Sequence, residues 1–307
     1  MLVQTIPVLS LDDFAQPARR SAFVQSFGQA LERFGFFALE HHGIDARLVQ
    51  SAYSAAEAFF ALPDHAKHQY EKAELKGQRG FTRFGKEHAK DHSVPDLKEF
   101  WHVGRPDDAS LPNLWPKQVP QFQPAMTTLF EQIEACALQL LEACALYLGQ
   151  PADWFTPEVT GGSSILRIIH YPPVPPTVEP QSMRAAPHED INLITLLCEA
   201  TSAGLELLQA NGEWLPIQPI PGQIIVDTGD MLQALSNGLI KSTTHRVTNP
   251  DSRRDRRFSM PFFVHPRPSF DLTPLPQCIA RTGGATRFPV QTAGQYLQAR
   301  LREIGLA

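Results

Sequence analysis

Apolar residues recur with helical spacing in the first half of the chain and in short, strand-like runs in the second. Residues 21–34 and roughly 125–149 have the three-to-four-residue period of helices that pack on one face. Cys136 and Cys144 fall among the apolar positions of the second segment, where small side chains pack well. We expect a further short helix in Thr292–Ile304.

Short apolar runs bounded by turn residues predict several strands after these helices. The expected strands lie in residues 188–197, on both sides of Asn211-Gly212 within 204–217, and in 223–227, 243–247 and 257–264. Asn-Gly is the dipeptide that best fits a two-residue hairpin turn. Many short strands separated by turns are typical of a jelly roll, in which two sheets face each other.

The predicted fold class is therefore α+β, with a double-stranded β-helix (jelly roll) core, a helical N-terminal region and a C-terminal helix. We place a mainly helical region in residues 1–155, and the jelly roll with its final helix in residues 156–307. A chain of 307 residues with 43% hydrophobic composition can bury a core of this size. The proline-rich segment 171–187 reads as a loop that leads into the first candidate site strand.

His188 and Asp190 open one of the predicted strands. Side chains alternate between the two faces of a strand, so residues 188 and 190 would point to one side and Glu189 to the other. Chance alone gives about half a His-x-Asp per chain of this composition, so the tripeptide needs its context. A jelly roll can bring His245, 55 positions beyond Asp190, to the same point.

Two imidazoles and one carboxylate on one face of an ion leave three neighbouring positions open. This arrangement is typical of non-haem Fe(II) oxygenases. Structural zinc sites have four protein ligands, usually with Cys, and no Cys pair here has zinc spacing. A catalytic zinc with three ligands and a water stays chemically open.

Arg257 and Ser259 follow His245 on the last predicted strand and share one of its faces. A guanidinium binds a carboxylate through two parallel hydrogen bonds, and a hydroxyl can add a third. We read the pair as a clamp for a dicarboxylic acid. We assign Arg253, Arg254 and Arg256 to surface charge instead. Arg267-Pro268-Ser269 has the same spacing, but its prolines suit a sheet interior poorly.

Several segments together resemble the isopenicillin N synthase-like branch of the 2-oxoglutarate/Fe(II)-dependent oxygenases. The segments that carry the resemblance are 5–9, 34–44, 96–103, 166–173, 188–197, 204–207, 242–250 and 257–263. The similarity thus covers most of the chain. It implies that His188, Asp190 and His245 bind Fe(II), and that Arg257 and Ser259 bind the distal carboxylate of 2-oxoglutarate.

Tyr171 matches a tyrosine that contacts the co-substrate in this family, although it could equally be a packed aromatic residue. Plant relatives carry Asn-x-Tyr at this strand, whereas this chain has Ile169-His170-Tyr171, so one asparagine contact is absent. By position in the resemblance we take as substrate-pocket candidates Phe81, Arg83, Phe100, Arg184, Phe262 and Phe263. Core packing is the alternative for each phenylalanine.

Charge and cysteine content exclude several other classes of protein. A net charge of −5 and a pI near 6.1 give no sign of nucleic-acid binding. The N-terminus lacks the pattern of a secretory signal, and no run of about 18 apolar residues predicts a membrane span. Four scattered Cys do not form a disulfide framework. We expect a cytoplasmic enzyme with a small-molecule substrate and no membrane or nucleic-acid partner; its oligomeric state stays open.

The leading interpretation is an oxygenase that uses Fe(II), 2-oxoglutarate and O2. It would hydroxylate, desaturate or cyclise a small organic substrate and release succinate and CO2. The first alternative is an oxidase of the isopenicillin N synthase type, in which Arg257 and Ser259 hold the substrate's carboxylate and no 2-oxoglutarate is used. A ligand-binding protein without turnover is the second.

Overall fold

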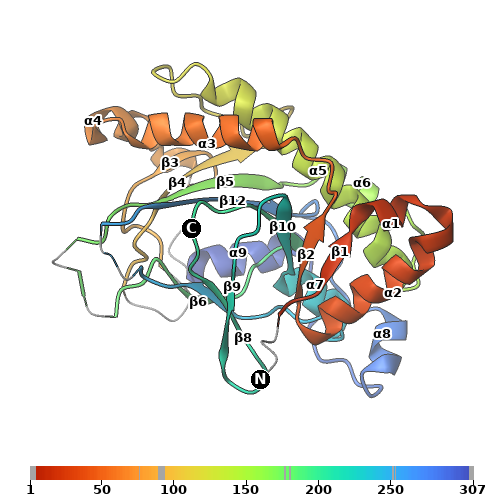
Figure 1. Cartoon of the computed structure of the whole chain (residues 1–307). Coiled ribbons are helices and arrows are strands. Elements are labelled where there is room, and N and C mark those ends of the chain that lie inside the picture. The colour runs from red at the N-terminus through yellow and green to blue at the C-terminus, as the bar shows by residue number, and fades with distance from the viewer. Residues whose placement is uncertain are drawn as a thin grey trace.

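Two β-sheets face each other, and helices cover the outer face of the larger one (Figure 1). The computed structural model describes residues 5–75, 77–88, 94–175, 178–179, 181–250, 252 and 254–303. Arg253 and the end of the expected C-terminal helix, Ile304, lie outside these ranges. The arrangement confirms the predicted α+β fold with a jelly-roll core.

The large sheet has eight strands among the described residues. In spatial order they are β1 (Val8–Ser10), β2 (Phe36–Glu40), β10 (Gln223–Thr228), β7 (Ile194–Cys198), β12 (Arg257–Val264), β5 (Ile165–Tyr171), β4 (Glu99–Gly104) and β3 (Gly80–Thr82). All neighbours are antiparallel except β1 and β2. The N-terminal region thus supplies four of the eight strands, which lie at the two ends of the sheet.

The small sheet holds four strands. They are β6 (Ala185–His188), β11 (His245–Val247), β8 (Leu205–Leu208) and β9 (Trp214–Ile217), in that order. The hairpin predicted around Asn211-Gly212 is present, but the expected two-residue turn is wrong. Leu208 pairs with Trp214, so five residues form the loop, and Gly212 provides its left-handed backbone at φ 84°.

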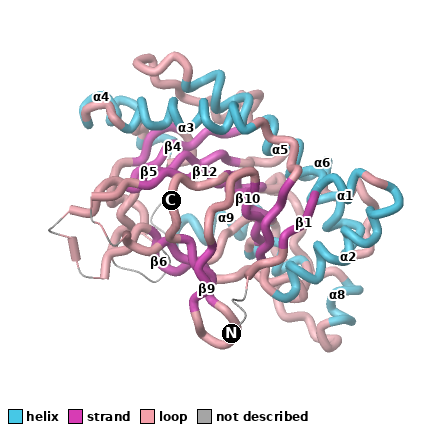
Figure 2. Tube along the Cα trace, viewed as in Figure 1, coloured by secondary structure: helices cyan, strands magenta, loops and turns pink. Residues whose placement is uncertain are grey.

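The helices lie mostly outside the sheets (Figures 1 and 2). They are α1 (Leu11–Ala15), α2 (Pro17–Arg33), α3 (Ala46–Phe60), α4 (Asp64–Lys67), α5 (Phe122–Tyr147), α6 (Thr156–Thr160), α7 (Asp230–Leu235), α8 (Pro276–Arg281) and α9 (Ala293–Glu303), with 3-10 turns η1 (His68–Tyr70) and η2 (Ala73–Leu75). The helices expected in 21–34, 125–149 and 292–304 correspond to α2, α5 and α9. None of the helices in the described ranges has the length and apolar composition to cross a bilayer.

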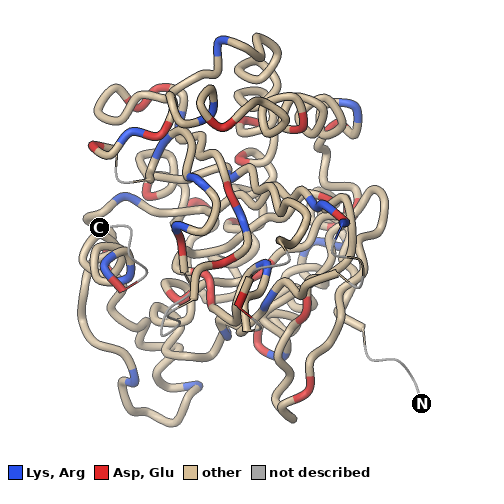
Figure 3. Tube along the Cα trace, turned by 90° about the vertical axis from the view of Figure 1, so that its left-hand side faces the viewer, with Lys and Arg blue, Asp and Glu red and all other residues tan. Residues whose placement is uncertain are grey.

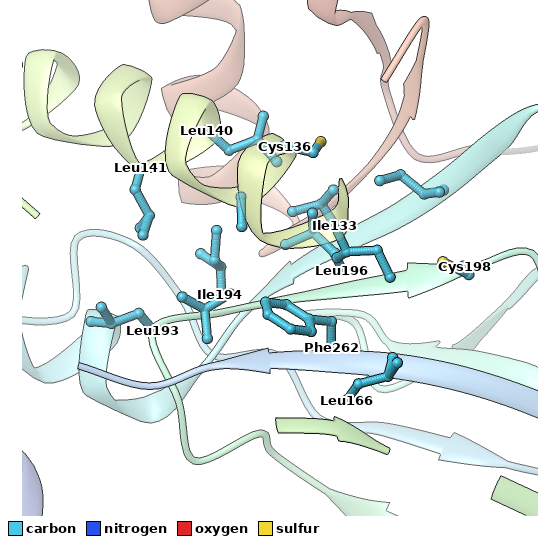
Figure 4. Packing of buried hydrophobic residues seen from close by; sticks show 14 of the residues in the cluster. Ile133, Cys136, Leu140, Leu141, Leu166, Leu193, Ile194, Leu196, Cys198 and Phe262 are labelled. Atoms are coloured by element: carbon cyan, nitrogen blue, oxygen red, sulfur yellow. The ribbon is translucent and has the colours of Figure 1, made fainter. Parts of the chain in front are cut away.

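Helix α5 packs on the middle of the large sheet (Figure 4). Ile133 and Leu140 of α5 lie in the same buried cluster as Leu196 of β7 and Phe262 of β12. Cys136 is also buried there, as the helical spacing predicted. Because this face is filled by packing, the opposite face of β5, β7 and β12 is the one turned toward the small sheet.

Charged residues of both signs are interspersed along the chain (Figure 3). Some of them pair inside the fold. Lys67 near the end of α4 binds Glu99 of β4 at 2.8 Å, and both side chains are buried. His170 of β5 also contacts Glu99, at 2.8 Å from its Nδ1. These pairs tie α4 to the helix-facing side of the sheet.

Candidate metal and co-substrate site

A cavity lies between the two sheets and receives side chains from both. Its lining comprises Phe36, Lys98, Arg167, Ile169, Tyr171, Ala185, His188, Asp190, Thr195, Leu197, Leu205, Ile225, Asp227, His245, Val247, Arg257, Ser259, Pro261 and Phe263. On β5 and β12 these are alternate residues, as the pleat of a strand requires. The intervening residues, such as Phe258 and Phe262, face the helices.

His188, Asp190 and His245 converge in this cavity. Their ligand atoms all lie within 4.8 Å of one another. Oδ1 of Asp190 is 3.8 Å from Nε2 of His245 and 4.0 Å from Nε2 of His188. Three donors so close, from two imidazoles and a carboxylate, form a group that could hold one metal ion.

The expectation that one strand carries both His188 and Asp190 is wrong. Strand β6 ends at His188, β7 begins at Ile194, and Asp190 lies in the turn between them. His188 pairs in the small sheet while Ile194 pairs in the large one, so the chain must cross between sheets here. Glu189 still faces away from the cavity group, because its carboxylate accepts a hydrogen bond from the Thr244 hydroxyl.

Backbone carbonyls set the orientation of both imidazoles. Nδ1 of His188 donates to the carbonyl of Ala186 at 2.7 Å, and Nδ1 of His245 donates to that of Thr243 at 3.2 Å. A carbonyl can only accept, so the proton sits on Nδ1 and Nε2 keeps its lone pair for a metal. Burial, together with the nearby His245, lowers the pKa of His188 to about 4, so this ring is neutral near pH 7.

A chain of hydrogen bonds holds the carboxylate of Asp190. The Thr195 hydroxyl donates to Oδ2 of Asp190, and the Asn192 amide donates to the Thr195 hydroxyl at 2.9 Å. The backbone carbonyl of Asp190 accepts from the amide of Asp230 at 2.7 Å. Gly229 is required beside this turn, since a Cβ there would lie 2.3 Å from the carbonyl oxygen of Asn192. The turn is therefore fixed on both sides.

Asp227 of β10 is a second carboxyl group close to Asp190. Burial, followed by the charge of Asp190, raises the pKa of Asp227 well above its ordinary value. Its Oδ2 has no hydrogen-bond partner among the described residues. Asp227 thus adds to the cavity wall a second carboxyl group whose charged form is disfavoured.

Arg257, Ser259 and Tyr171 lie together at another part of the cavity wall. Arg257 pairs with Tyr171, and Ser259 with Ile169, across β12 and β5. The guanidinium carbon of Arg257 is 5.2 Å from the centroid of the Tyr171 ring. Its Nε donates to the carbonyl of Ser202 at 3.1 Å, whereas Nη1 is buried and has no hydrogen-bond partner in the described part of the chain. An unpaired buried donor on a cation calls for an anionic acceptor.

Arg167 reaches the cavity farther along β5. Its guanidinium carbon lies 4.3 Å from the ring centroid of Phe100 and 5.2 Å from that of Phe263. Nε donates to Nε2 of His102 at 2.6 Å, and Nη1 donates to Glu87 at 2.9 Å. Burial and the charge of Arg167 lower the pKa of His102 well below its ordinary value, so the ring can accept this bond.

The six substrate-pocket candidates fall in different places. Phe263 lines the cavity, and Phe100 lies just behind it against Arg167 and Ile169. Phe81 and Phe262 lie in the core on the helix side of the large sheet. Arg83 is exposed and binds Glu71 at 3.2 Å. Arg184 is buried behind the cavity wall, with its guanidinium carbon 5.8 Å from the Tyr171 ring centroid.

Sequence reasoning missed Arg167, Lys98, Thr195 and Asp227, all of which line the cavity. Alternation could have found Arg167, because it lies four residues before Tyr171 and so shares its face of the strand. The same rule links Thr195 to Leu197. Lys98 directly precedes β4, two residues before Phe100, and Asp227 lies on β10; both segments are distant in sequence from the other residues of the site.

This fold and this group of donors define a non-haem iron oxygenase as the class of protein. Residues 162–266 match the 2OG-Fe(II) oxygenase superfamily, and residues 6–121 match the family described as non-haem dioxygenase in morphine synthesis N-terminal. The chain therefore belongs to the 2-oxoglutarate/Fe(II)-dependent oxygenases, and it is an enzyme that depends on iron and 2-oxoglutarate.

Individual relatives agree with this assignment over nearly the whole chain. The 2-oxoglutarate-Fe(II) type oxidoreductase hxnY of Emericella nidulans is 30% identical over 97% of this chain and 89% of its own length. A crystal structure of a 2OG-Fe(II) oxygenase family protein from Caulobacter crescentus is 38% identical, with a TM-score of 0.85 over 97% of this chain and 99% of its own. A full-length Neurospora crassa protein, crystallised in complex with alpha-KG, is 27% identical, with a TM-score of 0.88 over 98% and 97%.

Proposed function

We propose that His188, Asp190 and His245 hold the iron of this oxygenase. The donor set supports the proposal, since both rings offer Nε2 and the carboxylate is held in place by Thr195. Bound iron with 2-oxoglutarate supplies the activation of O2, coupled to decarboxylation of the co-substrate to succinate and CO2. The chain's own residues orient these reactants and exclude bulk water.

We further propose that Arg257, Ser259 and Tyr171 hold the distal carboxylate of 2-oxoglutarate. The observation that carries this proposal is the buried Nη1 of Arg257 on the cavity face of β12, which has no partner among the residues that the structure describes. The Ser259 side chain shares that face, and the Tyr171 ring adjoins the guanidinium. The relatives' use of 2-oxoglutarate favours this role over a clamp for the substrate of an oxidase.

The organic substrate would then meet the part of the cavity formed by Arg167 and Phe263. Nε and Nη1 of Arg167 are engaged by His102 and Glu87, which leaves Nη2 to donate to an acceptor oxygen of the substrate. Phe263 offers a flat apolar surface beside it. We propose that the substrate is a small organic molecule, encountered in the cytoplasm, which the enzyme hydroxylates, desaturates or cyclises.

Metal binding and turnover of single variants test the assignment of the iron ligands. We expect anaerobically purified protein to bind one Fe(II), and Asp190→Ala, His188→Ala and His245→Ala each to abolish succinate formation while the fold is kept. Glu189→Ala is the matched control, because Glu189 lies between His188 and Asp190 in the sequence, but its carboxylate accepts a hydrogen bond from Thr244 instead. If Asp190→Ala kept wild-type iron affinity and activity, the assignment would be wrong.

A further inference from the structure

Two arginines beside the Tyr171 ring are buried without a carboxylate partner among the described residues. Arg257 is 2% exposed and Arg184 is 1% exposed. Their guanidinium carbons lie 5.2 and 5.8 Å from the Tyr171 ring centroid. Both guanidinium groups donate to backbone carbonyls, Arg257 to that of Ser202 and Arg184 to that of Asp255. Nη1 of Arg257 and Nε of Arg184 have no hydrogen-bond partner among the described residues.

Other buried cations of the chain do have carboxylate partners. Lys98 lines the same cavity and lies 2.7 Å from Glu87 and 2.8 Å from Asp96. Arg79 is 1% exposed, like Arg184, and binds Asp108 at 3.3 Å. A buried charge without compensation is far less favourable than a paired one. The charge of Asp255 favours the protonated form of Arg184, but its carboxylate forms no ion pair with Arg184 in the described structure. The two arginines at Tyr171 therefore leave an excess of positive charge that an anion would balance.

The two guanidinium groups also act on each other. Burial, and next the charge of Arg257, lower the pKa of Arg184. Arginine nevertheless stays protonated near pH 7, because its ordinary pKa lies so far above neutrality. Both cations are thus present when an anion enters the cavity, and its arrival relieves their repulsion.

We propose that Arg184 is the second cation of the 2-oxoglutarate site and makes binding depend on the distal carboxylate of the co-substrate. The inference rests on the proposed function, in which Arg257 holds that carboxylate. Arg184 is absent from the cavity lining, so it acts through its charge and through Tyr171 rather than by contact. It is a positioning and specificity residue, not a catalytic one.

The size of the effect follows from the buried setting. Solvent screens interactions between buried charges less than those at the surface. At an effective dielectric constant near 20, removal of one such charge should weaken binding of a nearby carboxylate roughly tenfold. The affinity for a keto acid without the distal carboxylate should hardly change.

The test compares two keto acids. The dissociation constants of 2-oxoglutarate and of 2-oxopentanoate, which lacks the distal carboxylate, are measured by isothermal titration on anaerobic Mn(II)-loaded protein. We expect Arg184→Gln, which removes the charge and keeps an amide donor, to raise the dissociation constant of 2-oxoglutarate roughly tenfold and to change that of 2-oxopentanoate by no more than about twofold. Arg184→Lys keeps the charge and should keep most of the preference.

Arg105→Met is the matched control, since it removes a largely buried guanidinium that binds Glu134, outside the cavity lining. It should leave both constants unchanged. Equal weakening of the two keto acids by Arg184→Gln would show a structural role, and unchanged constants would show no role; either overturns the inference. An Arg184→Lys variant that behaves like Arg184→Gln would also overturn it. Failure of the proposed function looks different, because wild-type protein would then not bind 2-oxoglutarate.

Discussion

Arg167 and Arg257 both enter the cavity from the large sheet, but they meet different surroundings. Glu87 lies 2.9 Å from Arg167 and balances its charge. Arg257 has no carboxylate partner among the described residues, and one of its nitrogens is unpaired. At the scale of single residues, this difference separates a part of the cavity that suits an added anion from a part that suits a neutral or weakly charged group.

Replacement of Arg257 by Lys should raise the KM for 2-oxoglutarate at least tenfold. An ammonium group cannot form the two parallel hydrogen bonds of a guanidinium, and loss of one bond to a charged group costs about 1.5–3 kcal/mol. Arg256→Lys is the control, because Arg256 is adjacent in sequence but exposed. Steady-state kinetics checks both variants. Equal effects from the two would indicate a diffuse basic surface instead of a clamp.

At the scale of elements, strands that alternate cleanly could be predicted from sequence, and the crossing between sheets could not. Strand β12 occupies Arg257–Val264, the range expected, because its apolar residues follow a charged segment and end before His265. The segment from His188 to Leu197 looked equally strand-like. It divides because β6 and β7 pair with strands of different sheets, which is information held by residues far away in the chain.

The candidate site shows the same limit. Spacing and alternation were enough to place Arg257 and Ser259 on one cavity-facing side of a strand. Alternation could not locate Asp227, because no residue of its strand, β10, was singled out from the sequence. Its position depends on which strands become neighbours, and long-range pairing decides that.

Helix α9 is linked to the turn that carries Asp190. The Tyr296 hydroxyl donates to Asp230 at 2.6 Å, and Arg300 binds the same carboxylate at 2.8 Å. The backbone amide of Asp230 in turn donates to the carbonyl of Asp190 at 2.7 Å. The C-terminal helix therefore supports the turn that carries Asp190.

Tyr296→Phe should lower both the melting temperature and the Mn(II) affinity. The lost hydrogen bond to a carboxylate is worth about 1.5 kcal/mol, and a looser Asp190 turn should weaken metal binding several-fold. Tyr147→Phe is the matched control, since it removes a similar bond, 2.7 Å to Glu32, outside the cavity. We expect the control to lower the melting temperature alone. Equal Mn(II) affinities in the two variants would argue against the link.

At the scale of the whole molecule, packing of helices, a large sheet and a small sheet buries several neutral histidines. Burial is the main reason that the pKa of His265 is lowered to about 4, from an ordinary value near 6.5. The unfolded chain therefore takes up a proton between pH 6.5 and 4 that the folded chain does not. The contribution of His265 to the free energy of unfolding is fully present above pH 6.5 and is lost as the pH drops through this window.

His265→Gln should make the unfolding free energy less dependent on pH. Between pH 7 and pH 5 we expect the metal-free wild type to lose about 2 kcal/mol through this residue, a loss absent from the variant. Urea titrations at the two pH values measure it. His65→Gln, at an exposed position, should keep the wild-type dependence. A His265→Gln protein with an unchanged pH dependence would contradict the argument.

The central claim is that the cavity binds 2-oxoglutarate through Arg257, Ser259 and Tyr171 next to a metal held by His188, Asp190 and His245. Isothermal titration of anaerobic Mn(II)-loaded protein with 2-oxoglutarate tests it most directly. We predict one site per chain in the wild type, weakened roughly 10- to 150-fold in Ser259→Ala and in Tyr171→Phe, each of which loses one charge-assisted hydrogen bond. A wild-type protein that binds no 2-oxoglutarate under these conditions would contradict the account.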